Sequence, residues 1–260
     1  MSDWLHNLPV PWMALVVFGF TYLLAASIFA GVAMFATSDR VKSFKSISVL
    51  PPLGIIFGLF VAFTAAQVWS DSDRANVAVS REASALRSAF VLAASFPGDS
   101  ETRLRNLIRD YVLETATVEW PMMARQTASL NATPRPLAEA LQLVLALAAT
   151  SPGQQTAQRE ITSALETALD ARRQRIIVSR AEVNFVKWLC LYLQAACALL
   201  AIALVHCDDR LAAAIAMGLF ATGVAASVLL IAAHDRPFVG QISITPEPLL
   251  QIMPDAPANR

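Results

Sequence analysis

One acidic side chain in this 260-residue sequence lies at the spacing of an apolar helix face. Val79 lies three residues before Glu82 and Leu86 lies four residues after it, and Ala93 continues the same helix face. A buried carboxylate must pair with a cation or carry a proton. We therefore predict that Glu82 is buried and forms a salt bridge between helices, in preference to acting as a pH sensor or an ion relay. The candidate partners nearby are Arg81, Arg87 and Arg109.

A second group of reactive side chains has the wrong spacing to hold a metal ion. His206, Cys207, Asp208 and Asp209 are consecutive, and adjacent residues cannot all face one ion. The sequence also contains no Ser-His-Asp order, phosphate-binding loop, GxSxG or CxxC. We therefore expect no enzyme activity, no metal site and no cofactor.

The composition indicates a membrane protein. Hydrophobic residues make up 56% of the chain and charged residues 15%, whereas soluble domains average about 25% charged residues. The formal net charge is zero, so no basic surface suggests a nucleic-acid partner. The three cysteines are an odd number in or beside an apolar stretch, which argues against a disulfide framework. The expected surroundings are therefore a lipid bilayer.

Four apolar segments are long enough to cross a hydrocarbon core of ~30 Å. We expect these spans at about residues 11–36, 50–69, 186–205 and 211–233. Between the second and third spans the sequence is rich in Arg, Glu, Ala and Leu, with apolar residues at helical spacing. The predicted fold is an all-α integral membrane protein with four transmembrane helices and a helical extramembrane domain inserted between spans 2 and 3.

The predicted boundaries follow from breaks in the pattern. No glycine or proline separates Trp69 from Phe90 or Arg172 from Leu204, so the inserted domain should continue directly from span 2 and into span 3. Five prolines after His234 predict a tail that is extended and not helical. The expected parts are 1–70 for spans 1 and 2, 71–185 for the helical domain, 186–233 for spans 3 and 4, and 234–260 for the Pro-rich tail.

Basic residues near the spans give two opposite indications of orientation. The loop after the first span carries Arg40, Lys42 and Lys45, which favours a cytoplasmic position for that loop. The ends of the inserted domain carry more basic residues: Arg74, Arg81, Arg172, Arg173, Arg175 and Arg180. We expect a multi-pass protein of the cell (inner) membrane with its helical domain in the cytoplasm.

The second span carries two stripes of different character. One stripe contains small residues four apart, which let helix backbones approach closely in lipid: Gly54, Gly58, Ala62 and Ala66. The other stripe is bulkier and partly polar: Phe57, Phe60, Thr64 and Gln67. A helix of this kind belongs inside an assembly, although the pattern alone is equally consistent with an ordinary bundle.

Several short motifs of the sequence are shared with a known family. Pro52-Leu53, Gly58, Val61 and Trp69 are spaced as in the second transmembrane helix of the bestrophin anion channels, and Pro237-Phe238 follows the last span as it does there. The chain also resembles the bacterial bestrophin-like family of uncharacterised membrane proteins. That resemblance rests on Arg81-Glu82-Ala83, Tyr111-Val112, Glu119-Trp120-Pro121 and Asp235-x-Pro-Phe-x-Gly.

The resemblance implies an oligomeric ion channel in which five copies of the second span ring a central pore. The bestrophin constriction, carried over without gaps, falls on three apolar residues one turn apart: Pro51, Ile55 and Leu59. Small anions are the implied permeant ions. Periodicity alone instead favours a lining of Phe57, Phe60, Thr64 and Gln67. We prefer the first face, because the resemblance fixes a register that amphipathicity does not.

Two further points limit what the resemblance implies. Residues 239–242 contain no carboxylate, so the calcium site of animal bestrophins is not carried over. The spans contain no Asp, Glu, Lys or Arg at depth, which argues against an ion-coupled transporter. The alternative function is a non-conducting membrane scaffold or stress-response protein whose helical domain recruits a partner.

Overall fold

The computed structural model describes residues 8–35, 50–131 and 133–253, and all regular structure within these ranges is helical. The chain forms two compact units. Unit 1 contains the chain up to Ser70 together with Glu182–Arg236 and Gly240–Ile242. Unit 2 contains Asp71–Ala181, Pro237–Val239 and the chain from Ser243 onwards.

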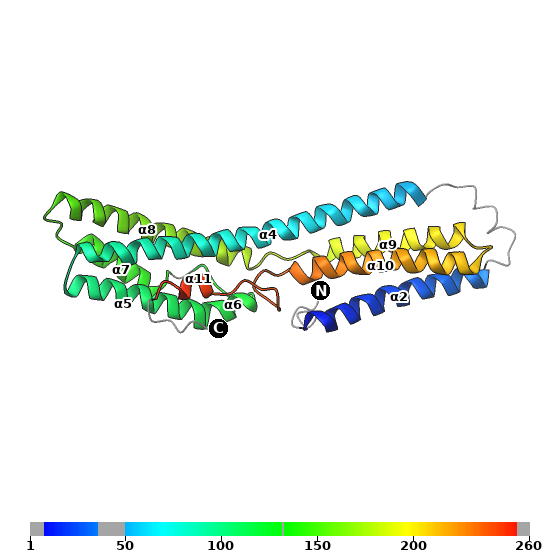
Figure 1. Ribbon diagram of the computed structural model, residues 1–260, viewed down its shortest axis with the longest axis horizontal. Coiled ribbons are helices and arrows are strands. Elements are labelled where there is room, and N and C mark those ends of the chain that lie inside the picture. The colour runs from blue at the N-terminus through cyan, green and yellow to red at the C-terminus, as the bar shows by residue number, and fades with distance from the viewer. Residues whose placement is uncertain (1–7, 36–49, 132, 254–260) are drawn as a thin grey trace. The chain divides into compact units, whose positions relative to one another are not determined.

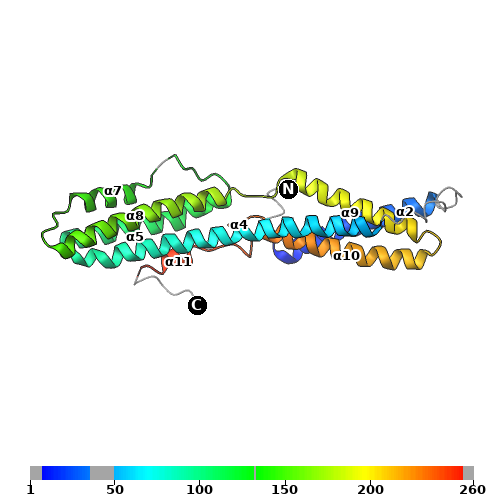
Figure 2. The same ribbon diagram turned by 90° about the horizontal axis from the view of Figure 1, so that it is seen from above.

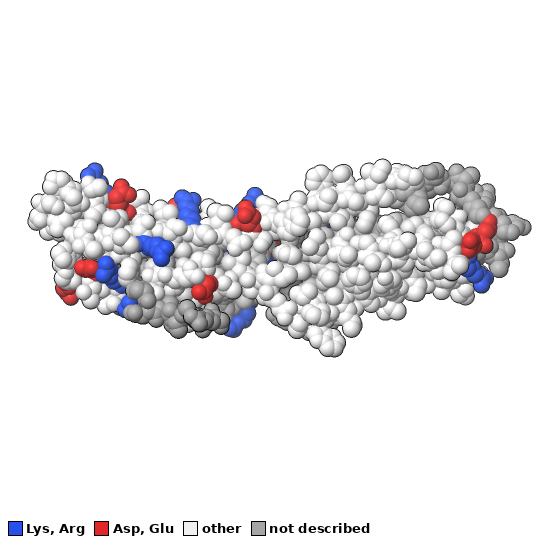
Figure 3. Space-filling model, in the orientation of Figure 1, with Lys and Arg blue, Asp and Glu red and all other residues white. Residues whose placement is uncertain are grey.

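Four helices are long and apolar enough to cross a membrane, which confirms the predicted all-α fold with four spans. They are α2 (Val10–Phe35), the first part of α4 (Leu50–Leu92), α9 (Phe185–Val205) and α10 (Arg210–His234). On the face drawn in Figure 3, charged side chains of described residues lie over the helices of unit 2 and at one end of the spans, with none over the middle of the spans.

Unit 1 is built on close packing of α2, α9 and α10 (Figure 1). Its core places Met13 and Val17 of α2 with Leu191 of α9 and Val228 of α10. A hydrogen bond of 2.7 Å also joins the hydroxyls of Tyr22 and Thr222, on α2 and α10. Such small hydroxyl contacts stabilise helix pairs in lipid, where no hydrophobic force acts between helices.

Unit 2 packs four long helices around one apolar core. These helices are the second part of α4, α5 (Asp99–Glu114), α7 (Arg135–Ala146) and α8 (Pro152–Val178), and Figure 2 shows α4, α5 and α8 running alongside one another. Each turns an apolar stripe inwards, as the helical period predicts. The fully buried side chains include Leu86, Leu104, Ile108, Leu137, Ile161 and Leu165.

The predicted continuity holds for α4 but is wrong for the third span. Helix α8 ends at Val178 and α9 begins at Phe185, although no glycine or proline lies between them. The Asn184 side chain accepts a hydrogen bond of 3.1 Å from the Val186 N–H and so caps α9. Asparagine is a good N-cap residue, and this cap starts a new helix where composition alone would allow the old one to continue.

The C-terminal segment also differs from the predicted extended tail. Glu247–Leu250 forms a short helix, α11, which follows Pro246. Leu249 is fully buried in the core of unit 2, and Ile252 joins the same core. Burial of these apolar residues offsets the cost of ordering a Pro-rich segment. Residues 254–260 of the expected tail lie outside the described residues.

The turn before α5 depends on a residue that only glycine fits easily. Gly98 has a φ of +101°. We predict that Gly98→Ala lowers the free energy of unfolding by about 2 kcal/mol, because a Cβ strains this backbone conformation. Gly153→Ala is the matched control: Gly153 is helical in the first turn of α8, and alanine there should raise stability by about 0.5 kcal/mol. Thermal unfolding followed by circular dichroism measures both; equal losses would contradict the prediction.

Candidate functional site

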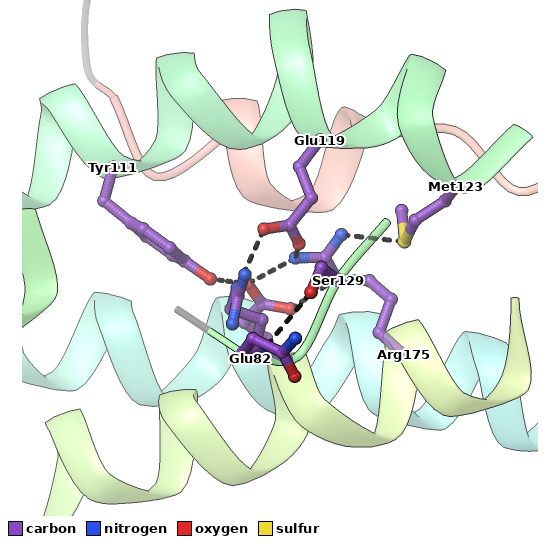
Figure 4. Close-up of polar contacts among 8 residues, drawn as sticks. Glu82, Tyr111, Glu119, Met123, Ser129 and Arg175 are labelled. Atoms are coloured by element: carbon purple, nitrogen blue, oxygen red, sulfur yellow. Dashed lines mark hydrogen bonds and ion pairs between the residues drawn. The ribbon is translucent and has the colours of Figure 1, made fainter. Parts of the chain in front are cut away.

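A cluster of paired charges lies in the core of unit 2. Helix α4 supplies Glu82 and α8 supplies Arg175, and both side chains are completely buried. Arg175 Nε lies 2.7 Å from Glu82 Oε2, and Arg175 Nη2 lies 3.1 Å from Glu82 Oε1. Arg175 Nη2 also donates to Glu119 Oε1 at 2.8 Å. Figure 4 shows these groups converging from three helical segments.

Other side chains complete the coordination of these ions. Tyr111 Oη donates a hydrogen bond to Glu82 Oε1. Arg172 Nε lies 2.8 Å from Glu119 Oε2, so two guanidinium groups balance two carboxylates. The Arg175 guanidinium carbon lies 5.0 Å from the centre of the Trp120 ring, where the aromatic face attracts a cation. A buried ion pair needs this kind of additional bonding to offset the cost of desolvation.

The surroundings of Arg175 and Tyr111 favour the ordinary protonation state of each. Burial lowers the pKa of Arg175, but the charge of Glu82 and the neighbouring Tyr111 and Glu119 outweigh burial, and the pKa rises above its ordinary value. Burial, with the Glu82 charge next, raises the pKa of Tyr111 well above its ordinary value. Arg175 therefore remains a cation and Tyr111 remains a neutral hydroxyl over the physiological range. This arrangement suits a helix-pairing salt bridge and does not suit a proton relay.

The partner of Glu82 differs from those that the sequence suggested. Arg81, Arg87 and Arg109 were the expected partners, and the structure instead supplies Arg175 from α8. Arg81 and Arg87 point outwards and are exposed. The partner lies 93 residues away in the sequence, so no local pattern could identify it.

A π-helical turn brings Glu119 to the cluster. Thr115–Glu119 forms this turn between α5 and the short helix α6 (Trp120–Ala124). Pro121 has no N–H to donate to a carbonyl in the preceding turn, which favours a departure from regular α-helix at this point. Single π-turns are frequent at functional sites because they redirect side chains. Sequence analysis missed Glu119, Arg172 and Arg175 as members of the site.

In the membrane part of α4, the two pore-lining faces considered from the sequence differ in their exposure. Ile55 and Leu59 are 69% and 57% exposed, and Pro51 is exposed beside them. Phe57 is only 7% exposed and packs on Phe220 of α10, with the ring centroids 5.6 Å apart. The two stripes therefore have different surroundings within one subunit.

The remaining members of the bulky stripe also make contacts within unit 1. Thr64 is buried, and its hydroxyl donates to the Phe60 carbonyl at 2.8 Å. Phe60 is half-buried, and Gln67 accepts a hydrogen bond from Lys187 Nζ of α9. All four side chains of this stripe are thus buried in unit 1 or contact another part of it.

The small-residue stripe is not covered by any residue that the structure describes. Gly54, Gly58, Ala62 and Ala66 are all exposed. A Cβ added at Gly54 or Gly58 would meet no atom within 4 Å among the residues that the structure describes. Helix backbones can approach this stripe closely from outside the subunit.

A polar junction follows the last span in unit 1. Asp235 is buried, and its Oδ1 accepts a hydrogen bond of 2.6 Å from the Val183 N–H. Arg236 Nη2 lies 2.8 Å from Glu182 Oε2. Burial raises the pKa of Asp235 to about 6, although the Val183 N–H and the Arg236 charge act in the opposite direction. The junction ties the end of α10 to the residues that lead into α9.

The His206–Asp209 run has structural contacts in place of a ligand arrangement. A ring nitrogen of His206 lies 3.0 Å from the Ile202 carbonyl, and Asp209 Oδ1 accepts hydrogen bonds from the N–H groups of Leu211 and Ala212. Within residues 8–35, 50–131 and 133–253, no three His, Cys, Asp or Glu side chains are grouped to hold a metal ion. The two hydrogen bonds that Asp209 accepts from the first turn of α10 make it the N-cap of that helix.

Comparison with known proteins gives one match. A family model described as the Bestrophin-like domain matches residues 19–249, which include Glu82, Arg175 and Asp235. This match confirms the resemblance drawn from the short motifs. Neither the curated proteins nor the solved structures contain a match to the chain.

We predict that Glu82→Ala destabilises the protein by about 3–5 kcal/mol, because Arg175 would be left as a buried cation without its main partner. Thermal unfolding and the size of the purified assembly are the measurements. Glu101→Ala is the control, since Glu101 forms a partly exposed ion pair with Arg105, with the Glu101 side chain 23% exposed, and its loss should cost less than about 1 kcal/mol. An unchanged melting temperature and size for Glu82→Ala would contradict the prediction.

The pKa of Asp235 predicts a pH-dependent stability. Folded Asp235 holds its proton up to about pH 6, whereas an unfolded aspartate releases it near about pH 4. Protonation therefore favours the folded state increasingly as pH falls through this window. Asp235→Asn, which mimics the protonated side chain, should be more stable than the wild type at pH 7.5, by about 1–3 kcal/mol. About half of this difference should remain at about pH 5, and the two proteins should be similarly stable at about pH 3.5. A stability difference that is constant with pH would refute this assignment.

Proposed function

Because the chain belongs to the bestrophin-like family, we propose that identical subunits form a ring around a central passage for small inorganic anions. Five subunits are the number that the bestrophin resemblance implies. The segment that lines the passage in this proposal is Pro51–Trp69 of α4. The exposed apolar face of this segment is the observation that carries the proposal.

The burial of α4 favours the constriction face over the bulky stripe. Phe57 and Thr64 already pack within unit 1, so they are not available to line a passage between subunits. Ile55 and Leu59 are exposed in a single subunit and lie one helical turn apart. In a ring they would form two apolar collars, and a narrow apolar collar can stop ion flow by losing its water.

The small-residue stripe supports association of α4 with a neighbouring copy. Gly54 and Gly58 are exposed and are not covered by other described residues, and close helix packing in lipid is the usual role of such residues. Within one chain, only 17% to 39% of the most apolar stretch of each span is buried. The remaining surface is available for lipid and for other subunits.

The ionisable groups suit passive flow better than coupled transport. Among described residues, the charged side chains nearest the membrane part of α4 lie at the ends of the spans, where Lys187 contacts Gln67. A coupled transporter normally keeps ionisable groups at depth. We further propose an inner-membrane location with unit 2 in the cytoplasm, in line with the arginines that flank its ends.

Anion flux from liposomes tests the proposal. We expect purified protein to release chloride, and Leu59→Ala or Ile55→Ala to raise the flux severalfold, because a wider collar holds water more easily. Leu23→Ala is the matched control: Leu23 is an equally exposed leucine on α2 and should leave the flux unchanged.

Three results would argue against parts of the proposal. Flux that neither substitution on α4 alters would place the constriction elsewhere. An absence of chloride flux, with intact protein of the correct size, would favour the scaffold. A subunit count of one or two by native mass spectrometry would exclude the ring.

A further inference from the structure

A cavity of about 380 Å³ opens in unit 2 beside the buried ion cluster. Its walls come from the end of α5, the π-helical turn, the loop after α6 and α8. The lining includes charged, hydroxyl and apolar side chains, among them Glu114, Thr115, Val118, Met122, Ser129 and Arg172. The proposed channel function assigns no role to this space.

The hydroxyl of Thr115 has no hydrogen-bond partner among the residues that the structure describes, although the residue is only 1% exposed. Other helical threonines, such as Thr117 and Thr162, donate to the carbonyl four residues earlier. Thr115 begins the π-helical turn and lines the cavity. The Thr115 oxygen is not fully buried, so it is accessible from the cavity and can accept a hydrogen bond from a ligand there.

The charges of the lining favour a cationic ligand. Arg172 is paired with Glu119, and Arg135 on the rim is paired with Glu139 at 2.6 Å. Glu114 has no ion-pair partner within the described part of the chain, so it adds one uncompensated negative charge. Both arginines are already occupied, and an anionic ligand would have to break one of these pairs.

The apolar part of the lining defines the remainder of the ligand. Val118 is half exposed and Met122 is half-buried, and both lie along the same cavity. They can cover a short hydrocarbon chain, as the apolar walls of small-molecule sites commonly do. Glu119 also retains acceptor capacity, because a carboxylate offers about four lone-pair sites and the two arginines use only part of them.

We propose that this cavity binds a small organic cation, in which an ammonium or guanidinium group is attached to a short apolar chain. The cationic N–H groups donate to the Glu114 carboxylate and to the Thr115 hydroxyl. The apolar chain lies against Val118 and Met122. The ion cluster formed by Glu82, Arg175 and their partners holds the π-helical turn in place and so fixes the position of Thr115.

Binding of n-butylammonium to the full chain in lipid nanodiscs tests this proposal by isothermal titration calorimetry. We expect saturable binding, with butyrate and n-butanol binding at least tenfold more weakly. Glu114→Gln should weaken binding roughly tenfold, the effect of losing one charged hydrogen bond. Asp110→Asn is the matched control: Asp110 is exposed one turn earlier on α5, outside the lining, and its loss should leave the affinity unchanged.

Thr115→Val separates binding from folding. Valine has nearly the shape of threonine, so the variant should bind n-butylammonium several-fold more weakly and melt at the same or a higher temperature than the wild type. A lower melting temperature would mean that the hydroxyl serves the fold, and would overturn its role in binding. Failure of n-butylammonium to bind, equal binding of butyrate, or equal weakening by Asp110→Asn would each overturn the proposal. None of these results depends on ion flux, so the channel proposal is tested separately.

Discussion

The buried pairing of Glu82 with Arg175 is the interaction on which the arrangement of unit 2 depends. Removing either ion from water costs several kcal/mol, and only a well-bonded partner offsets this cost. Pairing requires α4 and α8 to meet at one axial position, and Glu119 and Tyr111 then fix the π-helical turn and α5 around the same point. Apolar packing alone would tolerate small shifts between these helices, whereas the ion cluster permits one register.

In unit 1 the corresponding constraint is the division of α4 into two faces. Phe57, Thr64 and Val68 are buried against the rest of the unit, while Ile55 and Leu59 remain exposed. A lipid-facing helix has no need of two glycines and two alanines in one exposed row. Both the proposed passage and the proposed contact between copies therefore depend on the same unpartnered surface of one helix.

The sequence predicts some of these features better than others, for identifiable physical reasons. A run of about 20 apolar residues is a strong signal, so the spans lie close to their expected positions. The helical spacing of apolar residues predicts that Glu82 faces inwards. Its partner Arg175 comes from a different helix, so identifying that partner requires the tertiary fold. The break between α8 and α9 depends on the Asn184 cap, and asparagine is too common in other contexts to mark a helix start by itself. The π-helical turn leaves no periodic signature, so the cavity beside it was not foreseen.

The π-helical turn has a consequence for sequence variation in this region. A turn of this kind accommodates one residue more than an α-helix of the same length, so deletion of a residue such as Ala116 would allow Thr115–Glu119 to close into regular α-helix. The following side chains would then keep nearly the same directions around the helix axis, because the π-helical turn only takes up the extra residue. Glu119 would still reach the two arginines, and Trp120 would still face Phe238, whose ring centroid lies 5.4 Å from its own. Loss of one residue inside this turn should therefore be tolerated better than loss of one residue from the regular part of α5.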